Sequence, residues 1–149
     1  MRYSLNCDDN VWDGVFSEHT LEHLYPNQVL SLLKEINRTM KQRAWLRIAV
    51  PDLAKYVEYY CGKQTNQTFK RWPTGCEAIR CLTQNWVHLS VWDSKLLTRF
   101  LEEAGFISIR EVGFMEGTDP KLLKDSKDRR WESLYMEAQK DLKIMNYKK

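Results

Sequence analysis

Residues 16–24, FSEHTLEHL, constrain the fold more than any other part of this sequence, because they are compatible with two different structures. His19, Glu22 and His23 form the pattern H-x-x-E-H, which supports zinc-peptidase chemistry when it lies on one helix. The preceding residues 11–16, VWDGVF, are instead typical of a buried strand. In that structure the histidines follow the carboxyl end of a strand, where open α/β sheets bind their ligands.

The sequence around the motif argues against a zinc peptidase. Pro26 follows His23 by three residues and a predicted strand precedes His19, so we do not expect a continuous helix. A peptidase also needs a third ligand, and no pattern marks a glutamate on a later helix for that role. The peptidase is therefore a remote alternative, and we expect no metal.

The composition is that of an ordinary soluble domain. The 149 residues are enough for one domain, and 43% hydrophobic against 29% charged residues argues against disorder. A net charge of +3 is too balanced to indicate nucleic-acid binding. No apolar run approaches the roughly 20 residues that span a membrane, so we expect no membrane association.

The cysteines favour a reduced, cytoplasmic protein. The four of them, at positions 7, 61, 76 and 81, form no C-x-x-C pair, and no signal-like segment begins the sequence. A secreted disulfide scaffold is therefore disfavoured. A structural zinc site that combines His88 with Cys76 and Cys81 has no better support than the peptidase.

Hydrophobic spacing predicts the order strand, helix, strand, helix in the first half of the chain. We expect a strand over residues 12–16, a helix over 27–40, a basic turn at 41–43, a strand over 45–50 and a helix over 52–60. Short links between such elements predict a parallel sheet covered by helices.

The second half begins with a polar loop and ends with a predicted hairpin. We expect a loop over residues 62–75, a helix over 77–83, a helix over 94–104 capped by Asp93 or Ser94 and stopped by Gly105, and antiparallel strands over 106–114 and 133–138. The charged residues 118–130 between these strands are predicted to be exposed to solvent.

Four segments of the sequence resemble one enzyme family. WDGVFSEHTLEHL and LKEINRTMKQRAWLRIAVPDL resemble the class I S-adenosylmethionine-dependent methyltransferases of the methyltransferase type 11 kind. HLSVWDSKLLTRFLEEAGF is similar to a later helix of that family and its glycine stop, and RRWESLYMEAQK is similar to the final strand. The resemblance implies an α/β fold that forms part of a Rossmann-like sheet. It would have about four strands, two inner ones parallel and the last two an antiparallel hairpin, with helices on both faces. The implied activity is methyl transfer from S-adenosylmethionine to an unknown acceptor.

The chain departs from this family where the family binds its cofactor. Family members begin with a strand and a glycine-rich loop, whereas this sequence has six glycines, no G-x-G, and begins at a segment that resembles the fourth strand. Residues 41–44, KQRA, also replace the family's Pro-Gly-Gly turn. We therefore expect a single methyltransferase-like domain over residues 1–149 that lacks the N-terminal half of the fold. For the same reason we expect this chain alone to bind S-adenosylmethionine weakly or not at all. The competing hypothesis is a non-catalytic methyltransferase-like binding or interaction module.

This truncation predicts an exposed sheet edge at residues 12–16. We expect one of three segments to cover the edge. It could be another copy of the chain in a homo-oligomer, a separate N-terminal partner, or residues 1–7 of the same chain.

The resemblance assigns roles to residues that follow the predicted strands. Ser17 and Glu18 would face the cofactor. His19 would be a general base, since imidazole titrates near neutrality, unless it only shapes the loop. Contacts to a small-molecule acceptor are expected from Asp52, Tyr56 and His88, although Asp52 could equally cap a helix.

Other side chains have two interpretations each. Glu22 and His23 are expected to be structural. Four aromatic residues either line the acceptor pocket or pack under the loop at 62–75: Tyr59, Tyr60, Trp72 and Trp86. Three cations either meet an anionic acceptor or form a solvated face: Lys127, Arg129 and Arg130.

Overall fold

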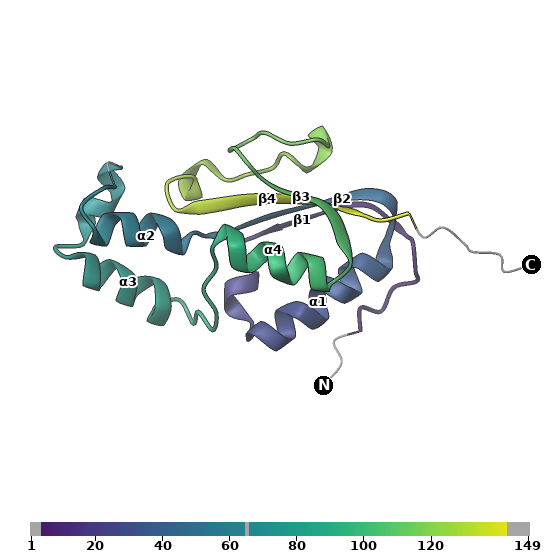
Figure 1. Cartoon of the computed structure of the whole chain (residues 1–149), viewed down its shortest axis with the longest axis horizontal. Helices are drawn as coiled ribbons and strands as arrows, with labels where there is room; N and C mark the ends of the chain where they lie inside the picture. The colour runs from purple at the N-terminus through teal and green to yellow at the C-terminus, as the bar shows by residue number, and fades with distance from the viewer. Residues whose placement is uncertain (1–3, 65, 143–149) are drawn as a thin grey trace, which may run out of the picture.

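The computed structural model describes residues 4–64 and 66–142, which form a mixed four-stranded sheet with helices packed against it (Figure 1). The strands are β1 (Trp12–Glu18), β2 (Met40–Pro51), β3 (Phe106–Val112) and β4 (Ser133–Lys140), in the sheet order β1-β2-β4-β3. β1 and β2 are parallel, and β4 is antiparallel to both β2 and β3. The predicted α/β sheet with a parallel pair and a C-terminal antiparallel hairpin is therefore confirmed.

Four α-helices lie within two residues of their predicted bounds. They are α1 (Pro26–Thr39), α2 (Leu53–Tyr60), α3 (Gly75–Gln84) and α4 (Ser94–Glu103). Short 3-10 helices join them: η1 (Leu21–His23), η2 (Gln67–Arg71), η3 (Pro120–Leu122) and η4 (Lys127–Arg129). Asp93 caps α4 by accepting a hydrogen bond from the amide of Leu96, and Gly105 follows the helix with a φ of +87°. In the part of the chain that the structure describes, no helix has the length and apolar character needed to cross a membrane.

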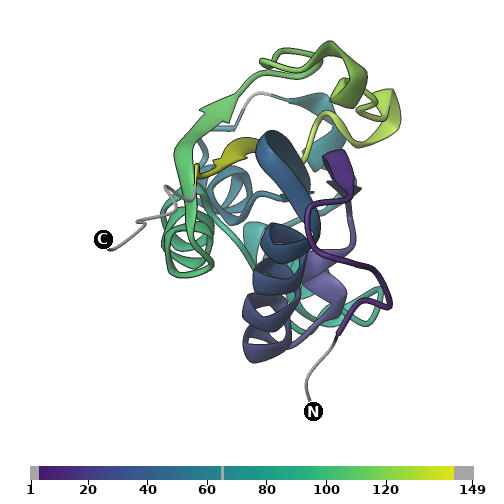
Figure 2. The same cartoon turned by 90° about the vertical axis from the view of Figure 1, so that its right-hand side faces the viewer.

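The two faces of the sheet are covered in different ways. α1 and α4 pack on one face, and the connection between β3 and β4, residues 113–132, lies over the other (Figures 1 and 2). The core beneath α1 and α4 is mainly aliphatic: Leu33, Ile36, Leu46, Ile48, Leu97, Leu101, Leu134 and Met136. Helices thus lie on both faces, but those over the second face are only the single turns η3 and η4.

A second, smaller core lies where α2 and α3 extend beyond the end of the sheet (Figure 1). Four buried side chains form it: Tyr56, Phe69, Ala78 and Leu82. Trp72 and Trp131 are partly buried and pack against this cluster. The aromatic residues around α2 therefore contribute to the packing of this second core.

α1 passes directly into β2, and the basic turn predicted at residues 41–43 was wrong. Met40, which ends the helix, already has an extended backbone with φ −72° and ψ 147°. Between the pairs Trp12↔Met40 and Gly14↔Trp45, β1 advances by two residues and β2 by five. The additional residues form a bulge within the strand, where Arg43 has a φ of +63°.

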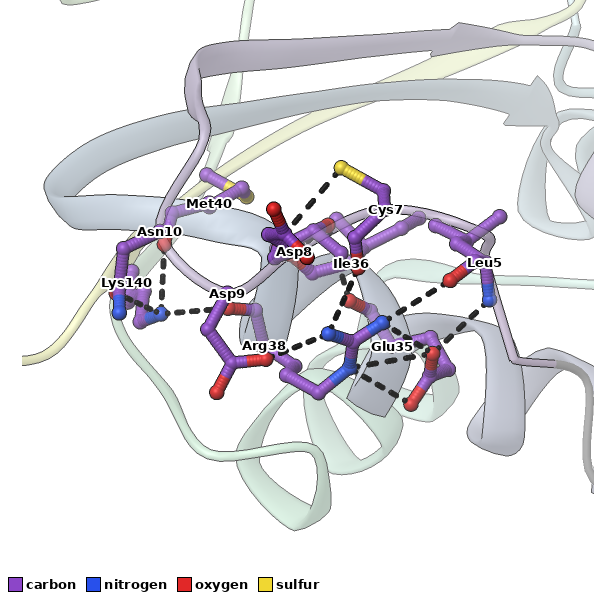
Figure 3. A network of polar contacts seen from close by, with 11 residues as sticks. Leu5, Cys7, Asp8, Asp9, Asn10, Glu35, Ile36, Arg38, Met40 and Lys140 are labelled. Carbon is purple, nitrogen blue, oxygen red and sulfur yellow. Dashed lines mark hydrogen bonds and ion pairs between the residues drawn. The ribbon is translucent and has the colours of Figure 1, made fainter.

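Residues 4–10 run along α1 rather than along the outer edge of β1. The Arg38 guanidinium donates to the carbonyl of Cys7 at 3.0 Å and pairs with Asp9 and Glu35 (Figure 3). Among the described residues no strand lies beyond β1, so this edge is uncovered there. The first three residues of the cover expected at 1–7 lie outside the described part of the chain.

Arg47 of β2 holds the 113–132 connection against the sheet. Its side chain and that of Asp125 are 1% and 0% exposed, and the guanidinium contacts both carboxylate oxygens, at 2.8 and 2.5 Å. Arg47 also donates to the carbonyls of Gly113 and Glu116. The prediction that residues 118–130 are solvent-exposed is therefore wrong at Asp125, because Arg47 compensates the buried carboxylate.

We expect Asp125→Asn to lower the free energy of unfolding by about 3–5 kcal/mol, because it leaves the Arg47 charge buried without its partner. The measurement is urea denaturation followed by circular dichroism. Asp13→Asn is the control, since the Asp13–Lys41 pair is exposed and should add little. Equal effects of the two substitutions would contradict the role given to Asp125.

Candidate functional site

A cavity of about 400 Å³ opens at the carboxyl ends of β1 and β2. Because β4 runs antiparallel to β2, the residues that precede β4 reach the same edge of the sheet. Histidines, aromatic residues and paired charges dominate its walls: His19, His23, His88, Tyr56, Trp72, Trp86, Trp131, Glu22, Glu132, Arg71 and Arg129.

The backbone around His19 excludes the single helix that a zinc peptidase needs. His19 continues the pairing of β1, since its amide donates to the carbonyl of Ala49 at 2.9 Å. It then turns the chain with a φ of +47°, and only the short η1 follows before α1 begins at Pro26. The peptidase alternative is therefore not supported, because strand pairing separates His19 from the turn that carries His23.

His19 is held at both ring nitrogens. Its Nε2 lies 2.8 Å from Ser133 Oγ, and its Nδ1 lies 3.4 Å from Glu22 Oε1. The Ser133 hydroxyl donates to the carbonyl of Arg129 at 2.7 Å, so we assign the donor role to His19 Nε2. In a neutral ring the Nδ1 lone pair then faces a carboxylate oxygen. A proton or a metal cation between these two atoms would make the contact favourable.

Ser133, His19 and Glu22 contact one another in the order found in serine hydrolases. The serine, however, is not accessible to a substrate. Ser133 is 1% exposed and does not line the cavity. Its hydroxyl proton is also directed to the Arg129 carbonyl. Ser133 therefore positions His19 rather than acting as a nucleophile.

His88 reaches the cavity from the loop that precedes α4. The amides of Leu89 and Ser90 donate to the carbonyl of Glu22 at 2.7 and 3.1 Å, which ties this loop to η1. The His88 ring packs edge-on against that of His23, with centroids 5.0 Å apart. Trp86 lies in the same loop with a φ of +63° and lines the cavity while remaining largely exposed.

Asp52 caps the start of α2 and Tyr56 lies on this helix, and the two residues have different surroundings. Asp52 caps α2 by accepting a hydrogen bond from the amide of Ala54 at 3.0 Å, and burial raises the pKa of its carboxyl. Tyr56 lines the cavity, and its hydroxyl donates to Glu132 Oε2 at 2.6 Å. Burial, together with the Glu132 charge, raises the pKa of the Tyr56 hydroxyl, so this hydroxyl is a donor at neutral pH.

Ser17 and Glu18 lie at the end of β1 outside the cavity lining. Glu18 accepts a hydrogen bond from the amide of Ser126 at 2.8 Å, and Ser17 pairs with Ile48 of β2. Of the six predicted site residues, the structure brings three together around the cavity: His19, Tyr56 and His88. The others lie beside it: Ser17, Glu18 and Asp52.

The sequence analysis missed several residues of the cavity wall. Glu132 and Trp131 precede β4, and the Arg71 guanidinium lies 4.6 Å from the centroid of the Trp131 ring. Arg129, which the sequence analysis did name as a possible contact to an anionic acceptor, also lines the cavity and pairs with Glu132 at 3.0 Å. The predicted antiparallel hairpin was a usable signal, because it places the start of the last strand at the same edge as the ends of the first two.

Neither a protein-family model nor a curated protein matches this sequence. Solved structures do match the fold. A methyltransferase from Archaeoglobus fulgidus, described as dependent on S-adenosylmethionine (SAM), superposes with a TM-score of 0.55 and 18% identity, over 90% of this chain and 62% of that one. A SAM-dependent methyltransferase from Thermotoga maritima gives a TM-score of 0.61 and 14% identity, over 93% and 60%. A Haloferax volcanii methyltransferase, solved in complex with the Trm112 activator, superposes with a TM-score of 0.53 and 15% identity. The match covers 93% of this chain and 58% of that one.

These similarities show a fold of the Rossmann-like methyltransferase type. The family resemblance in the sequence is thereby supported at the level of the fold. The chain spans 62%, 60% and 58% of the length of these three structures, respectively.

We expect Asp52→Asn and Asp52→Ala to separate the capping role of Asp52 from the effect of its charge. Asparagine caps as well as aspartate, so Asp52→Ala should be less stable than Asp52→Asn by about 1 kcal/mol. Because burial raises the folded-state pKa of Asp52, the folded protein holds more protons than the unfolded chain over the pH interval just above the usual aspartate pKa. The free energy of unfolding of the wild type should therefore fall relative to Asp52→Asn as the pH rises through that interval. Urea denaturation between about pH 3 and pH 7 measures this, and parallel pH profiles would contradict it.

Proposed function

We propose that this chain forms one wall of the active site of a SAM-dependent methyltransferase and that its cavity binds the methyl acceptor. The observation that carries the proposal is the position of the cavity. It opens at the carboxyl ends of the parallel strands β1 and β2, in a fold that methyltransferases share. Ligands of open α/β sheets bind at this edge. The structural neighbours favour neither the zinc peptidase nor the non-catalytic module.

The walls suit a small, flat, polar acceptor. Trp72 and Trp131 contribute aromatic surface with Arg71 over their rings, and Arg129 lies beside the carboxylate of Glu132. A volume of about 400 Å³ is in the range of small-molecule sites. We infer that aromatic stacking orients the acceptor and that charged hydrogen bonds select it.

The described residues do not complete a SAM site. The sequence contains no G-x-G motif of the kind whose backbone a cofactor could approach closely. We therefore propose a two-part site. Ser17 and Glu18 would form this chain's part of the cofactor site. The segment that covers the outer edge of β1 would supply the remaining contacts to the cofactor. The complex of the Haloferax neighbour with its activator supports assembly with a second polypeptide.

Within this site His19 is proposed as the base that takes the acceptor's proton. Its Nδ1 would receive the proton, because Nε2 already donates to Ser133. Tyr56 and His88 would contact the acceptor directly from the cavity wall. Asp52 would contribute by fixing the start of α2, the helix that carries Tyr56.

We expect isothermal calorimetry to detect no tight binding of SAM to the chain alone, because the described residues form only one wall of the site. A dissociation constant in the low-micromolar range would contradict the two-part site. It would leave the methyltransferase fold unaffected.

The proposed location of the cofactor is tested by amide NMR with S-adenosylhomocysteine at millimolar concentration. We expect small shifts confined to the ends of β1 and β2, reduced by Glu18→Gln. Glu103→Gln, an exposed change on α4, is the matched control. Shifts that map elsewhere, or an unchanged response in Glu18→Gln, would argue against the proposed site.

A further inference from the structure

The Glu22 carboxylate is buried without a hydrogen-bond donor. The residue is 1% exposed, and neither of its side-chain oxygens accepts a hydrogen bond from any residue that the structure describes. Its backbone carbonyl, in contrast, accepts from Leu89 and Ser90, which fixes η1 against the loop that carries His88. A buried carboxylate is unfavourable unless a positive charge compensates it.

All three histidines of the sequence surround this carboxylate or stack beside it. His19 Nδ1 and His23 Nε2 lie 3.4 and 3.8 Å from Glu22 Oε1, and His88 packs against His23. One ligand atom from each of Glu22, His23 and His88 can be chosen so that all three lie within 4.8 Å of one another. The end of β1, the turn η1 and a loop more than sixty residues later converge here.

The hydrogen bonding of His88 leaves one ring nitrogen with its lone pair. Its Nδ1 lies 2.6 Å from the carbonyl oxygen of Leu82, which can only accept, so Nδ1 carries the proton. Nε2 is then available as a ligand. Histidines that bind metals usually donate their other N–H to a carbonyl or carboxylate in this way.

We propose that Glu22, His23 and His88 bind a divalent transition-metal ion, with zinc as the best match. Two imidazole nitrogens and one carboxylate are a known zinc donor set, whereas magnesium and calcium prefer oxygen ligands alone. Tetrahedral zinc holds its ligand atoms about 3.4 Å apart. The observed separations are at most 4.8 Å, and the half-exposed His23 side chain has the most room to adjust. All three residues line the cavity.

This site differs from the H-x-x-E-H peptidase site in its ligands. His88 takes the place of His19, which remains bonded to Ser133. This proposal departs from the sequence-based expectation of no metal. It does not depend on methyl transfer, and its test measures binding rather than catalysis.

The experiment uses the full chain, freed of metal by a chelator, with Co²⁺ and Zn²⁺ as probes. We expect one Co²⁺ per chain, with the visible absorption of a four-coordinate nitrogen and oxygen site, and displacement by Zn²⁺. Zn²⁺ should raise the Tm, because it binds only the folded protein. Glu22→Gln and His88→Gln should each weaken Co²⁺ binding by about tenfold or more. Glu103→Gln, on the exposed face of α4, should not.

Three outcomes would overturn the proposal. The first is an absence of binding, with His19 carrying two protons in ¹⁵N imidazole spectra, which would leave an ion pair with Glu22. The second is unchanged affinity in both Glu22→Gln and His88→Gln. The third is a thiolate-to-cobalt charge-transfer band, since Cys81 also lines the cavity and the proposed ligands contain no sulfur. If Glu22→Gln fails to fold, His88→Gln with an unchanged circular dichroism spectrum decides the question.

Discussion

The buried pair between Arg47 and Asp125 is the interaction on which the arrangement of this molecule depends most. The residues of β2 and β4 that face away from α1 and α4 include Arg47 and Glu137, which need polar partners rather than an apolar helix surface. The 113–132 connection supplies these partners. Because the connection ends at Arg129, Trp131 and Glu132, the pair that fixes it to the sheet also fixes one wall of the cavity.

Much of this fold could be predicted from sequence because the determining signals are local. The apolar stripe of α1, the aspartate that caps α4 and the glycine that follows it are set by neighbouring residues. The bulge after Met40 and the burial of Asp125 are not local. Each depends on a strand or charge far away in the sequence, and a charged segment is solvated by default unless a partner such as Arg47 is known.

The same distinction applies to the cavity. Strand prediction placed His19 at a ligand edge, and aromatic content indicated Tyr56 as part of a pocket wall. Glu22 was predicted to be structural, because no pattern in FSEHTLEHL indicates that its side chain turns inward. Its burial depends on the loop of His88, whose amides hold the Glu22 carbonyl. That contact links η1 with a loop whose backbone at Trp86 and Val87 is left-handed, a conformation that hydrophobic spacing does not indicate.

Two buried carboxylates line the cavity, and their surroundings explain why only one of them is proposed to attract a metal ion. Glu132 accepts hydrogen bonds from the Tyr56 hydroxyl and from Arg129, so a permanent cation and a neutral donor already compensate its charge. Among the described residues Glu22 pairs only with the imidazoles of His19 and His23. The nearby His88 directs its Nδ1 proton to a backbone carbonyl, which leaves the Nε2 lone pair for the proposed site. Neutral imidazole lone pairs and a carboxylate repel one another unless a cation lies between them. The proposal for Glu22 therefore rests on the absence of an arginine or lysine ion pair to its carboxylate among the described residues, whereas Glu132 pairs with Arg129 and holds the Tyr56 hydroxyl.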